Sequence, residues 1–291
     1  MYGLAYCNHQ IRVMKGRLIK WTVNKIAEYR KDSFKSSFNP VWLNSIPSNV
    51  NFTVVSFSGK KQFLDQLFSI ASFYRNIGKP ESWTIYNDGT YTDEELDIFH
   101  RIERICIKEI SSFRKELPEA SLKKFPTLQK IEILKNISPN SPVIFTDSDI
   151  LFYKGLRRYE KMLEQHNWYI ADEGFSYFDT DYIANNATDM EPLNLGFMVL
   201  NSKPKWGPVL DYIVGKFNEG RLSYWTDQTA CHIMAQNEKF KVLSKEEFVV
   251  GGNDSFKFKS ASDYNRIALR HFVGPVRHKM WQYSWKKVLE I

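Results

Sequence analysis

Two aspartates, Asp147 and Asp149, are separated by one residue and follow the apolar residues 143–145 and Thr146. Two carboxylates with this spacing at the end of a strand can turn toward one hard cation, and Mg²⁺ or Mn²⁺ prefers such oxygen ligands. The same cation would take the oxygens of a diphosphate. Because ligands of open α/β sheets bind at the carboxyl ends of the strands, the pair predicts a metal site for a phosphate-bearing substrate. Asp-x-Asp also occurs in ordinary turns, so the interpretation needs support from other segments.

Two further segments carry side chains suited to ligand binding. Asn194 and Gly196 precede an apolar run, where a glycine would let the backbone approach a ligand before it enters a core strand. An ordinary turn into a strand would look the same. Asp227 and Gln228 follow Thr226, which we expect to be a helix N-cap. Asp227 would then lie in the first helical turn, where an acid either serves a site or interacts with the helix dipole.

The last such segment begins at His271 and continues through Gly274, Arg277 and Lys279. A histidine, a flexible glycine and nearby cations could supply a metal ligand and a clamp for a diphosphate. A lone histidine is more often structural, but here the cations favour a functional role. Lys130, on the helix expected before the aspartate pair, could reach a phosphate or a donor hydroxyl, or be a solvated helix cation.

The spacing of apolar residues before residue 150 predicts alternating strands and helices. Strands are expected over residues 52–57, 83–86, 104–110 and 143–145, with one more over residues 168–171. Helices are expected from residue 63 to the Gly78 and Pro80 break, from the Thr92 and Glu95 capping box, and over residues 122–134. This alternation favours an α/β fold with a mostly parallel central sheet flanked by helices on both faces.

The four segments, in this order, resemble the nucleotide-diphospho-sugar transferase superfamily with the type A glycosyltransferase (GT-A) fold. The chain is most similar to the family-8-type retaining enzymes, which include glycogenin and bacterial lipopolysaccharide galactosyltransferases. The resemblance covers roughly residues 50–282. It implies a metal-dependent transfer of sugar from a nucleotide diphosphate donor, by default a UDP-sugar, with retention of configuration. The basic N-terminal stretch and the basic residues of the tail favour a glycolipid or lipid-linked acceptor, and a soluble protein or saccharide acceptor is the alternative.

The resemblance also implies roles for individual residues. Mn²⁺, or Mg²⁺, would be bound by Asp147, Asp149 and His271. Asn194 and Gly196 match the family's Asn-x-Gly segment. The family's Asp-Gln pair matches Asp227 and Gln228, near the reacting sugar carbon. As a hypothesis of mechanism beyond these matched motifs, Ser56, Phe57, Asn87 and Asp88 would hold the nucleoside and Ser148 would lie beside the donor. Gly274, Arg277, Lys279 and Lys130 would lie at the diphosphate or donor sugar.

Two features depart from the family or leave its chemistry open. The family commonly has a lysine six positions after the histidine, followed by Pro-Trp, but here Arg277 holds that position and Lys279 and Trp281 are displaced by two. If the enzyme instead inverts configuration, it needs a carboxylate base. Asp172 or Glu173, directly after the strand expected over residues 168–171, could serve.

Other classes of protein fit the motifs less well. A phosphatase of the haloacid-dehalogenase type wants Thr or Val two residues after the second aspartate, where this chain has Leu151. A nucleotidyltransferase would want a longer glycine-rich loop than the one around Gly59. The net charge of +7 permits a non-enzymatic, basic polyanion-binding adaptor. No helix-turn-helix, zinc-finger or RNA-recognition pattern supports binding to nucleic acid.

The organisation expected is a basic N-terminal appendage over residues 1–48 and a single GT-A domain over residues 49–291. The nucleotide-binding half would be residues 49–150 and the acceptor half residues 151–291. Apolar residues in the appendage have roughly helical spacing, with cations between them. Such a segment could lie on an anionic membrane, or pack on the main domain with a solvated basic face.

The three cysteines are widely spaced, and neither a disulfide framework nor a metal-ligand spacing is indicated. The chain also lacks a long apolar run and a signal-peptide core. We therefore expect a cytoplasmic protein, with a peripheral position at the inner face of the membrane as an option.

Overall fold

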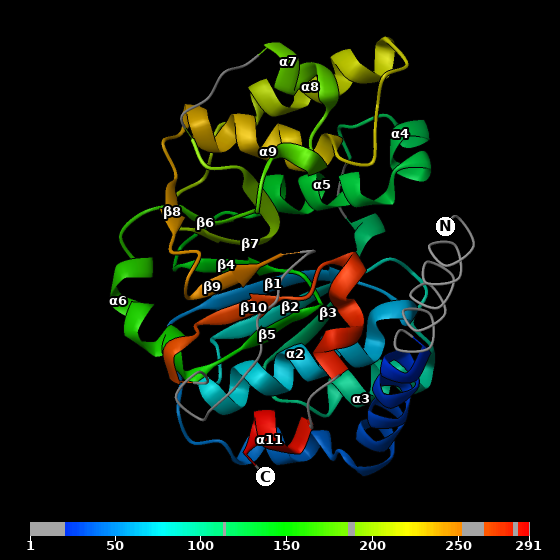
Figure 1. Ribbon diagram of the computed structural model, residues 1–291, viewed down its shortest axis with the longest axis vertical. Helices are drawn as coiled ribbons and strands as arrows, with labels where there is room; N and C mark the ends of the chain where they lie inside the picture. Colours follow the sequence, from blue (N-terminus) through cyan, green and yellow to red (C-terminus); the bar gives the residue numbers. More distant parts are fainter. Residues whose placement is uncertain (1–20, 113–114, 186–189, 252–264, 282–284, 291) are drawn as a thin grey trace, which may run out of the picture.

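The computed structural model describes residues 21–112, 115–185, 190–251, 265–281 and 285–290. A seven-stranded mixed sheet runs through the centre of the molecule, with helices above and below it (Figure 1). In spatial order its strands are β3 (Ile105–Glu109), β2 (Ser82–Asn87), β1 (Thr53–Ser58), β4 (Val143–Thr146), β7 (Leu193–Leu200), β6 (Trp168–Ala171) and β8 (Lys241–Leu243).

The sheet is parallel on one side of β4 and mixed on the other. β1 pairs in parallel with both β2 and β4, and β2 pairs in parallel with β3. β7 runs antiparallel to β4 and β6, and β8 pairs in parallel with β6. The predicted α/β fold with a mostly parallel sheet is therefore confirmed, and the expected strands lie within about one residue of the observed ones.

Helices cover both faces of the sheet because each face buries its own apolar cluster. Below the sheet lie α2 (Phe63–Asn76), α3 (Asp93–His100) and α11 (Trp285–Leu289), and above it α4 (Glu119–Lys124), α5 (Gln129–Asn136), α7 (Thr180–Asn185), α8 (Gly207–Asn218) and α9 (Thr226–Asn237). Phe68 and Trp83 belong to the lower cluster, and Phe145 and Met234 to the upper one. Alternate side chains of a strand point to opposite faces, so one strand such as β4 serves both clusters.

Short elements complete the fold. They are the helix α6 (Glu160–Leu163) and the 3₁₀ helices η1 (Pro40–Ser45), η2 (Lys60–Gln62), η3 (Ile110–Ser112), η4 (Pro126–Leu128), η5 (Lys154–Tyr159), η6 (Phe175–Tyr177) and η7 (Gly274–Trp281). The predicted capping box forms at the start of α3, where the Thr92 side chain accepts from Glu95 N and the Glu95 carboxylate accepts from Thr92 N.

A second, three-stranded sheet brings the end of the chain to the aspartate pair. Its order is β5 (Ile150–Phe152), β10 (Leu269–His271) and β9 (Phe248–Val250), and β10 runs antiparallel to β5. The register pairs His271 with Ile150, the residue directly after Asp149. The backbone N–H of Phe272 donates to the carbonyl of Asp149 at 2.9 Å. This pairing, rather than any local sequence feature, places the late histidine at the Asp-x-Asp turn.

Three local predictions were wrong. The single helix expected over residues 122–134 is divided into α4, η4 and α5, because Pro126 disfavours helical geometry at the preceding Phe125, which has φ −127° and ψ 82°. Asn194 and Gly196 lie inside β7 and not in a turn before it. Thr226 is the first residue of α9, the N-cap being Trp225, and the Thr226 hydroxyl accepts from Ser223 N instead of capping the helix.

The described part of the N-terminal segment packs against the main domain. Residues 21–37 form a helix. Phe34 of this helix is fully buried, and its ring centroid lies 5.4 Å from that of Phe68 and 5.3 Å from that of Trp281. Lys31 of the same helix pairs with the buried carboxylate of Asp65 at 2.8 Å. The division at residue 48 remains a prediction, and residues 1–20 lie outside the described residues.

Spanning a bilayer takes about 20 apolar helical residues, and no helix within the described ranges meets that requirement. Cys106 is an exposed free thiol and Cys231 a buried one, while Cys7 lies outside the described residues.

Candidate active site

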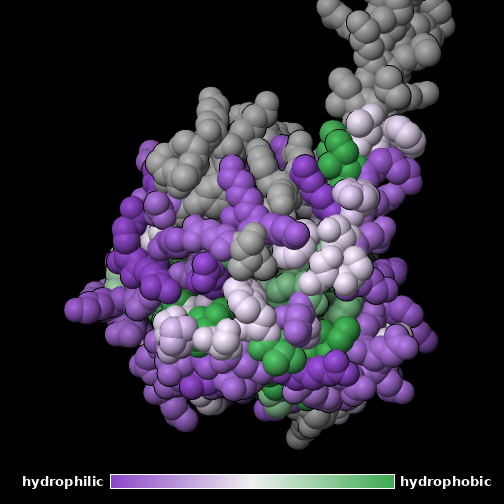
Figure 2. Space-filling model, turned by 90° about the horizontal axis from the view of Figure 1, so that it is seen from below, coloured by the Kyte–Doolittle hydropathy of each residue, from purple (hydrophilic) through white to green (hydrophobic). Residues whose placement is uncertain are grey.

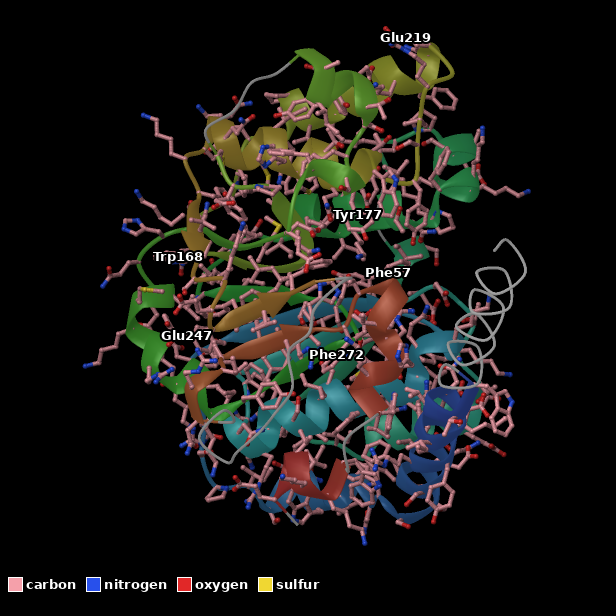
Figure 3. The ribbon with its side chains drawn as sticks, in the orientation of Figure 1. Phe57, Trp168, Tyr177, Glu219, Glu247 and Phe272 are labelled. Atoms are coloured by element: carbon pink, nitrogen blue, oxygen red, sulfur yellow. The ribbon has the colours of Figure 1, made fainter. Side chains whose placement is uncertain are left out.

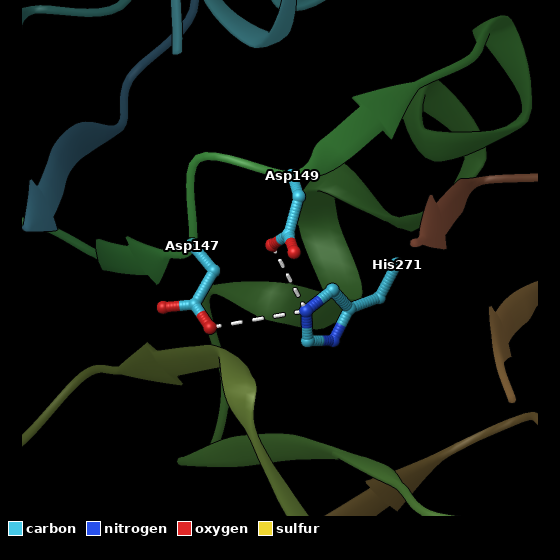
Figure 4. Close-up of side chains that lie close together, drawn as sticks. All are labelled: Asp147, Asp149 and His271. Carbon is cyan, nitrogen blue, oxygen red and sulfur yellow. Dashed lines mark hydrogen bonds and ion pairs between the residues drawn. The ribbon is translucent and has the colours of Figure 1, made fainter. Parts of the chain in front are cut away.

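The two aspartates leave β4 at the carboxyl edge of the sheet. The backbone N–H of Asp147 donates to the carbonyl of Gly196 on the neighbouring β7 at 2.8 Å, which fixes the start of the turn. Asp149 is almost fully buried, and Asp147 is partly exposed. Both side chains face His271 across the turn (Figure 4).

Asp147, Asp149 and His271 form a cluster able to hold a cation. Each offers one ligand atom, and these atoms lie within 4.8 Å of one another. His271 Nε2 is 3.1 Å from Asp149 Oδ1 and 3.8 Å from Asp147 Oδ2. Two carboxylates and one imidazole suit Mn²⁺ and, through their oxygens, Mg²⁺.

Asn194 and Gly196 fix the imidazole of His271. The Nδ1 atom of His271 lies 2.9 Å from Asn194 Oδ1, and the same oxygen accepts from Gly196 N at 2.9 Å. With Nδ1–H donating to that amide oxygen, Nε2 faces the two aspartates, and its lone pair would be available to a metal ion bound between them. A Cβ atom at residue 196 would lie 2.2 Å from the His271 ring, so only glycine leaves room for it.

Two cations neutralise the two aspartates. Lys130 Nζ lies 2.6 Å from Asp147 Oδ1 and 2.8 Å from its Oδ2. Arg277 Nε and Nη2 both donate to Asp149 Oδ2, at 2.9 and 2.5 Å. Burial alone would raise the pKa of the Asp149 carboxyl, but His271 and Arg277 outweigh it and hold that pKa well below its ordinary value.

Lys130 remains charged although most of its side chain is covered. Burial disfavours its ammonium form, yet the carboxylates of Asp147 and Asp227 keep the pKa of Lys130 above its ordinary value. Burial also raises the pKa of Asp227 to about 6, against the opposing effect of Lys130. The site thus combines permanent cations with a carboxyl group that titrates near neutrality.

A chain of buried amides joins the cluster to Asp172. Asn194 Nδ2 donates to Asp172 Oδ2 at 2.8 Å, and Gln228 Nε2 donates to the same oxygen at 3.4 Å. The Gln228 carbonyl oxygen accepts from Leu195 N at 3.4 Å. Asp172 Oδ1 accepts from Glu173 N at 2.8 Å. Asp172 is therefore held by three donors at the end of β6, facing the cavity.

These groups share one cavity of about 280 Å³. Its lining contains eleven residues expected from the sequence: Lys130, Asp147, Asp149, Asp172, Asn194, Gly196, Asp227, Gln228, His271, Gly274 and Arg277. They come from β4, β6, β7, β10, α5, α9 and η7, so the fold gathers side chains that are up to 147 residues apart in sequence.

The expected nucleoside ligands lie outside that lining. Ser56 is buried and its hydroxyl accepts from Trp83 Nε1 at 3.0 Å, below the sheet. Phe57 packs on the upper side of β1 and is labelled in Figure 3. Asn87 and Asp88 end β2, where Asn87 Nδ2 donates to Glu109 and Asp88 Oδ1 accepts from Thr90 N at 3.0 Å. Their role at the nucleoside remains a prediction.

Two other expected residues also lie away from the cavity lining. Ser148 sits in the turn between the two aspartates and is buried. Lys279 lies on η7, two residues beyond Arg277, and is partly buried. Of the two candidate diphosphate cations on η7, only Arg277 faces the cavity.

An aromatic group in the cavity was not singled out from the sequence. Tyr177, Tyr224 and Trp225 line its wall, and the Trp225 ring lies 4.9 Å from each of the other two. Figure 3 labels Tyr177 in the upper half of the molecule, across from Phe57 on the sheet. Trp225 directly precedes Thr226, Asp227 and Gln228 in the sequence. In the structure its large ring is 36% exposed, and this exposure marks it as a candidate site residue.

Asp179 holds the loop that carries these aromatic residues. It is buried, and its carboxylate accepts from the hydroxyls of Ser223 at 2.5 Å, Thr226 at 3.1 Å and Tyr212 at 2.9 Å. Its backbone N–H donates to Thr229 Oγ1 at 2.9 Å. This network ties the segment after η6 to α8 and to the start of α9.

The comparisons with known proteins agree with this architecture. No protein-family model and no curated protein sequence matches the chain. Solved structures with the same fold include the galactosyltransferase LgtC in complex with donor and acceptor sugar analogs, at TM-score 0.55 and 11% identity, covering 82% of this chain and 95% of that one. The chain therefore has the GT-A fold of glycosyltransferases, as the resemblance implied.

Two further solved structures share the fold. Glycosyltransferase GlyE of Streptococcus pneumoniae matches at TM-score 0.52 and 14% identity, over 83% of this chain and 63% of that one. Mouse xyloside xylosyltransferase 1 matches at TM-score 0.51 and 9% identity, over 79% of this chain and 99% of that one. Proteins with different sugars and different sources thus share this arrangement of strands.

Proposed function

We propose that the chain is a metal-dependent glycosyltransferase that moves a sugar from a nucleotide diphosphate donor to a saccharide or glycolipid acceptor. One observation carries the proposal: two carboxylates and an imidazole converge within 4.8 Å beside two cations, in a cavity at the carboxyl edge of a GT-A sheet. The cavity is also large enough for a sugar ring, and LgtC has been solved with donor and acceptor sugar analogs.

Asp147, Asp149 and His271 would hold Mn²⁺ or Mg²⁺. When bound, such an ion supplies Lewis-acid assistance to a leaving diphosphate. The side-chain geometry supports this role, because Asn194 holds the imidazole with Nε2 toward the carboxylates and Gly196 leaves space for the ring.

Arg277 and Lys130 would bind the diphosphate oxygens. Both are cations beside the metal cluster, and guanidinium groups bind phosphate in a two-pronged manner. Fixed positive charge at the diphosphate stabilises the charge that develops as the sugar departs. Ser56, Phe57, Asn87 and Asp88 remain the proposed nucleoside contacts, Ser148 would lie beside the donor, and Gly274 would let the backbone approach it.

We propose that transfer retains configuration, with Asp227 and Gln228 beside the reacting sugar carbon. The fixed position of the Gln228 side chain supports this role. Gln228 is buried, and rotation of its side chain would break its hydrogen bonds with Asp172 and with the backbone N–H of Leu195. Asp172 offers the inverting alternative, as a base at the opposite end of the amide chain. The anomeric configuration of the first product, measured by proton NMR before it equilibrates, decides between the two.

The donor base is the first property to test. Thermal unfolding is measured with UDP, GDP, ADP and CDP, with and without Mn²⁺, because a ligand that binds only the native state raises the midpoint. We expect a metal-dependent rise with UDP. An Asp149→Asn variant should lose the rise, because it loses one carboxylate ligand. Equal shifts in wild type and variant would refute the metal assignment. No shift with any nucleotide, together with salt-sensitive binding to a polyanion, would favour the adaptor.

A further inference from the structure

The helix at residues 21–37 has two apolar sides, and the main domain covers only one of them. Ala27 and Phe34 face the core. Trp21, Ile26 and Tyr29 lie on the other side, with 60, 41 and 74% of their surfaces exposed. At about 100° per residue, these three occupy one arc of the helix and the buried pair occupies the opposite arc. Exposed polar residues such as Asp32 and Ser36 share that arc, so its apolar part is the patch of Trp21, Ile26 and Tyr29, which a helix that needed only to pack on the domain would not require.

The N-terminal segment of the sequence is basic. Residues 12–35 contain eight Lys and Arg residues against Glu28 and Asp32, a net charge of +6, of which the helix at residues 21–37 carries +2. Lys25 lies within the exposed arc and pairs with Glu28 at 2.7 Å, with both side chains more than half exposed. Figure 2 shows apolar surface at the start of the described helix, surrounded by hydrophilic side chains.

We propose that the exposed side of this helix, formed by Trp21, Lys25, Ile26 and Tyr29, docks on an anionic bilayer surface. Tryptophan and tyrosine are favoured at the level of lipid headgroups, and isoleucine reaches the acyl boundary. Lysine and arginine near such a surface are each attracted to anionic lipids by about 1 kcal/mol. Nucleic acid would account for the charge, but it would leave Ile26 without an apolar partner.

The position of the helix gives this docking a use. A second cavity, of about 220 Å³, is lined by Asn24, Glu28 and Lys31 of the helix and by Arg277 of the candidate active site. The first turns of the helix therefore lie next to the diphosphate cation. A bilayer in contact with Trp21 and Ile26, on the outer side of the same helix, would lie one helix diameter, ~10 Å, from this second cavity. Resting on the proposed function, this proximity favours a lipid-linked or glycolipid acceptor over a soluble one.

Binding to vesicles tests the docking without any nucleotide. The full chain is sedimented with vesicles of phosphatidylcholine alone and of equal parts phosphatidylcholine and phosphatidylglycerol, at low and high salt. We expect binding to the anionic vesicles only, weakened by salt. Ile26→Ser should lower the partition coefficient about fivefold, since it removes a partly buried branched side chain from the lipid contact. Trp21→Ser combined with Tyr29→Ser should lower it further.

Ile183→Ser is the matched control. Ile183 on α7 is 42% exposed, against 41% for Ile26, and lies on the opposite side of the sheet. It should bind vesicles as wild type does. Circular dichroism should show both variants folded, because Phe34 and not Ile26 anchors the helix. Equal partitioning of Ile26→Ser and wild type, or equal binding to neutral vesicles, would overturn the proposal. So would concentration-dependent dimerisation that Ile26→Ser abolishes, because a second copy would then be the partner.

The acceptor inference has a separate readout. Transfer to a lipid-linked acceptor in anionic vesicles should fall in Ile26→Ser, while nucleotide-induced thermal shifts stay at the wild-type value. Loss of vesicle binding with normal nucleotide shifts implicates the docking surface alone. Normal vesicle binding without any nucleotide shift would instead count against the proposed function.

Discussion

Arg277 donates from both Nε and Nη2 to a single oxygen of Asp149, the carboxylate oxygen that does not face His271. The Arg277 guanidinium therefore supplies positive charge to the Asp149 carboxylate, which a bound metal ion would otherwise supply. Metal binding should therefore weaken the hold of Asp149 on Arg277 and leave the guanidinium available to the diphosphate. The arrangement predicts that metal and nucleotide assist each other's binding.

Arg277→Gln tests this competition. Without nucleotide, the variant should bind Mn²⁺ more tightly, by roughly threefold to tenfold, because Asp149 loses a competing charged donor. In the presence of Mn²⁺ it should bind the nucleotide diphosphate at least tenfold more weakly, as expected for loss of a charge-assisted hydrogen bond. Isothermal titration calorimetry measures both constants. Lys279→Gln is the control, since Lys279 lies outside the cavity lining. If the Lys279 variant lost nucleotide affinity instead, Lys279 would be the diphosphate cation.

Gly196→Ala should weaken metal binding while leaving most of the fold intact. The added Cβ would lie 2.2 Å from the His271 ring, which must move and thereby lose its contact with Asn194. We expect Mn²⁺ affinity to fall by about 10-fold to 100-fold, the range seen when the supporting shell of a metal site is disturbed. Gly215→Ala on α8, where a Cβ meets nothing within 4 Å, is the control. It should keep metal affinity and gain about 0.5–1 kcal/mol of stability from helix propensity. Unchanged Mn²⁺ affinity in Gly196→Ala would argue against His271 as a ligand.

Local chemistry and apolar periodicity were enough to predict the parallel strands of the central sheet and most of the cavity lining. The Asp-x-Asp pair and the late histidine form one cluster in the structure, and Asn194 of the Asn-x-Gly segment contacts its imidazole. Breaks within elements were harder to predict. Pro126 interrupts a run of residues whose apolar spacing continues on both sides of it. The Thr226 hydroxyl donates to the Asp179 carboxylate instead of capping the helix that it begins.

Long-range pairing explains the remaining differences. Nothing near Asp179 signals that three hydroxyls from α8 and α9 converge on it. The apolar residues of helical spacing in the N-terminal segment include Trp21 and Ile26, but the residues that pack the 21–37 helix on the domain are Ala27 and Phe34. Which apolar stripe is buried depends on the shape of the surface that receives the helix, and one sequence does not report that shape.

Asp227 predicts a specific pH dependence of stability. Its pKa is about 6 in the folded protein, against an ordinary value of 3.8. The folded state therefore holds a proton that the unfolded state has released, and stability falls as pH rises from about 4 to 6. The full loss is about 3 kcal/mol at 1.36 kcal/mol per pKa unit. Asp227→Asn removes this cost, so in EDTA it should be more stable than wild type above pH 6 and gain nothing below about pH 4.

Urea unfolding at several pH values measures that difference. Asp211→Asn on α8 is the matched substitution, because Asp211 is exposed and its carboxylate keeps its hydration on folding. It should show no gain that grows with pH. A stability difference between Asp227→Asn and wild type that stayed constant from pH 4 to 8 would mean that Asp227 titrates normally in the folded protein.

Asp179 should prove to be a positioning residue for the cavity wall. Asp179→Ala leaves the hydroxyls of Ser223, Thr226 and Tyr212 without their shared acceptor, so we expect a loss of about 2–4 kcal/mol of stability. Tyr212→Phe, the control, removes one of the three bonds and should cost about 1 kcal/mol. Because Ser223 and Thr226 flank Tyr224 and Trp225, the Ala variant should also alter tryptophan fluorescence. These residues belong to the predicted acceptor half, residues 151–291, so KM for the acceptor should rise more than KM for the donor. Tyr212→Phe should keep both KM values. Equal rises in both KM values in Asp179→Ala would show that the residue supports the fold in general and not this wall of the cavity.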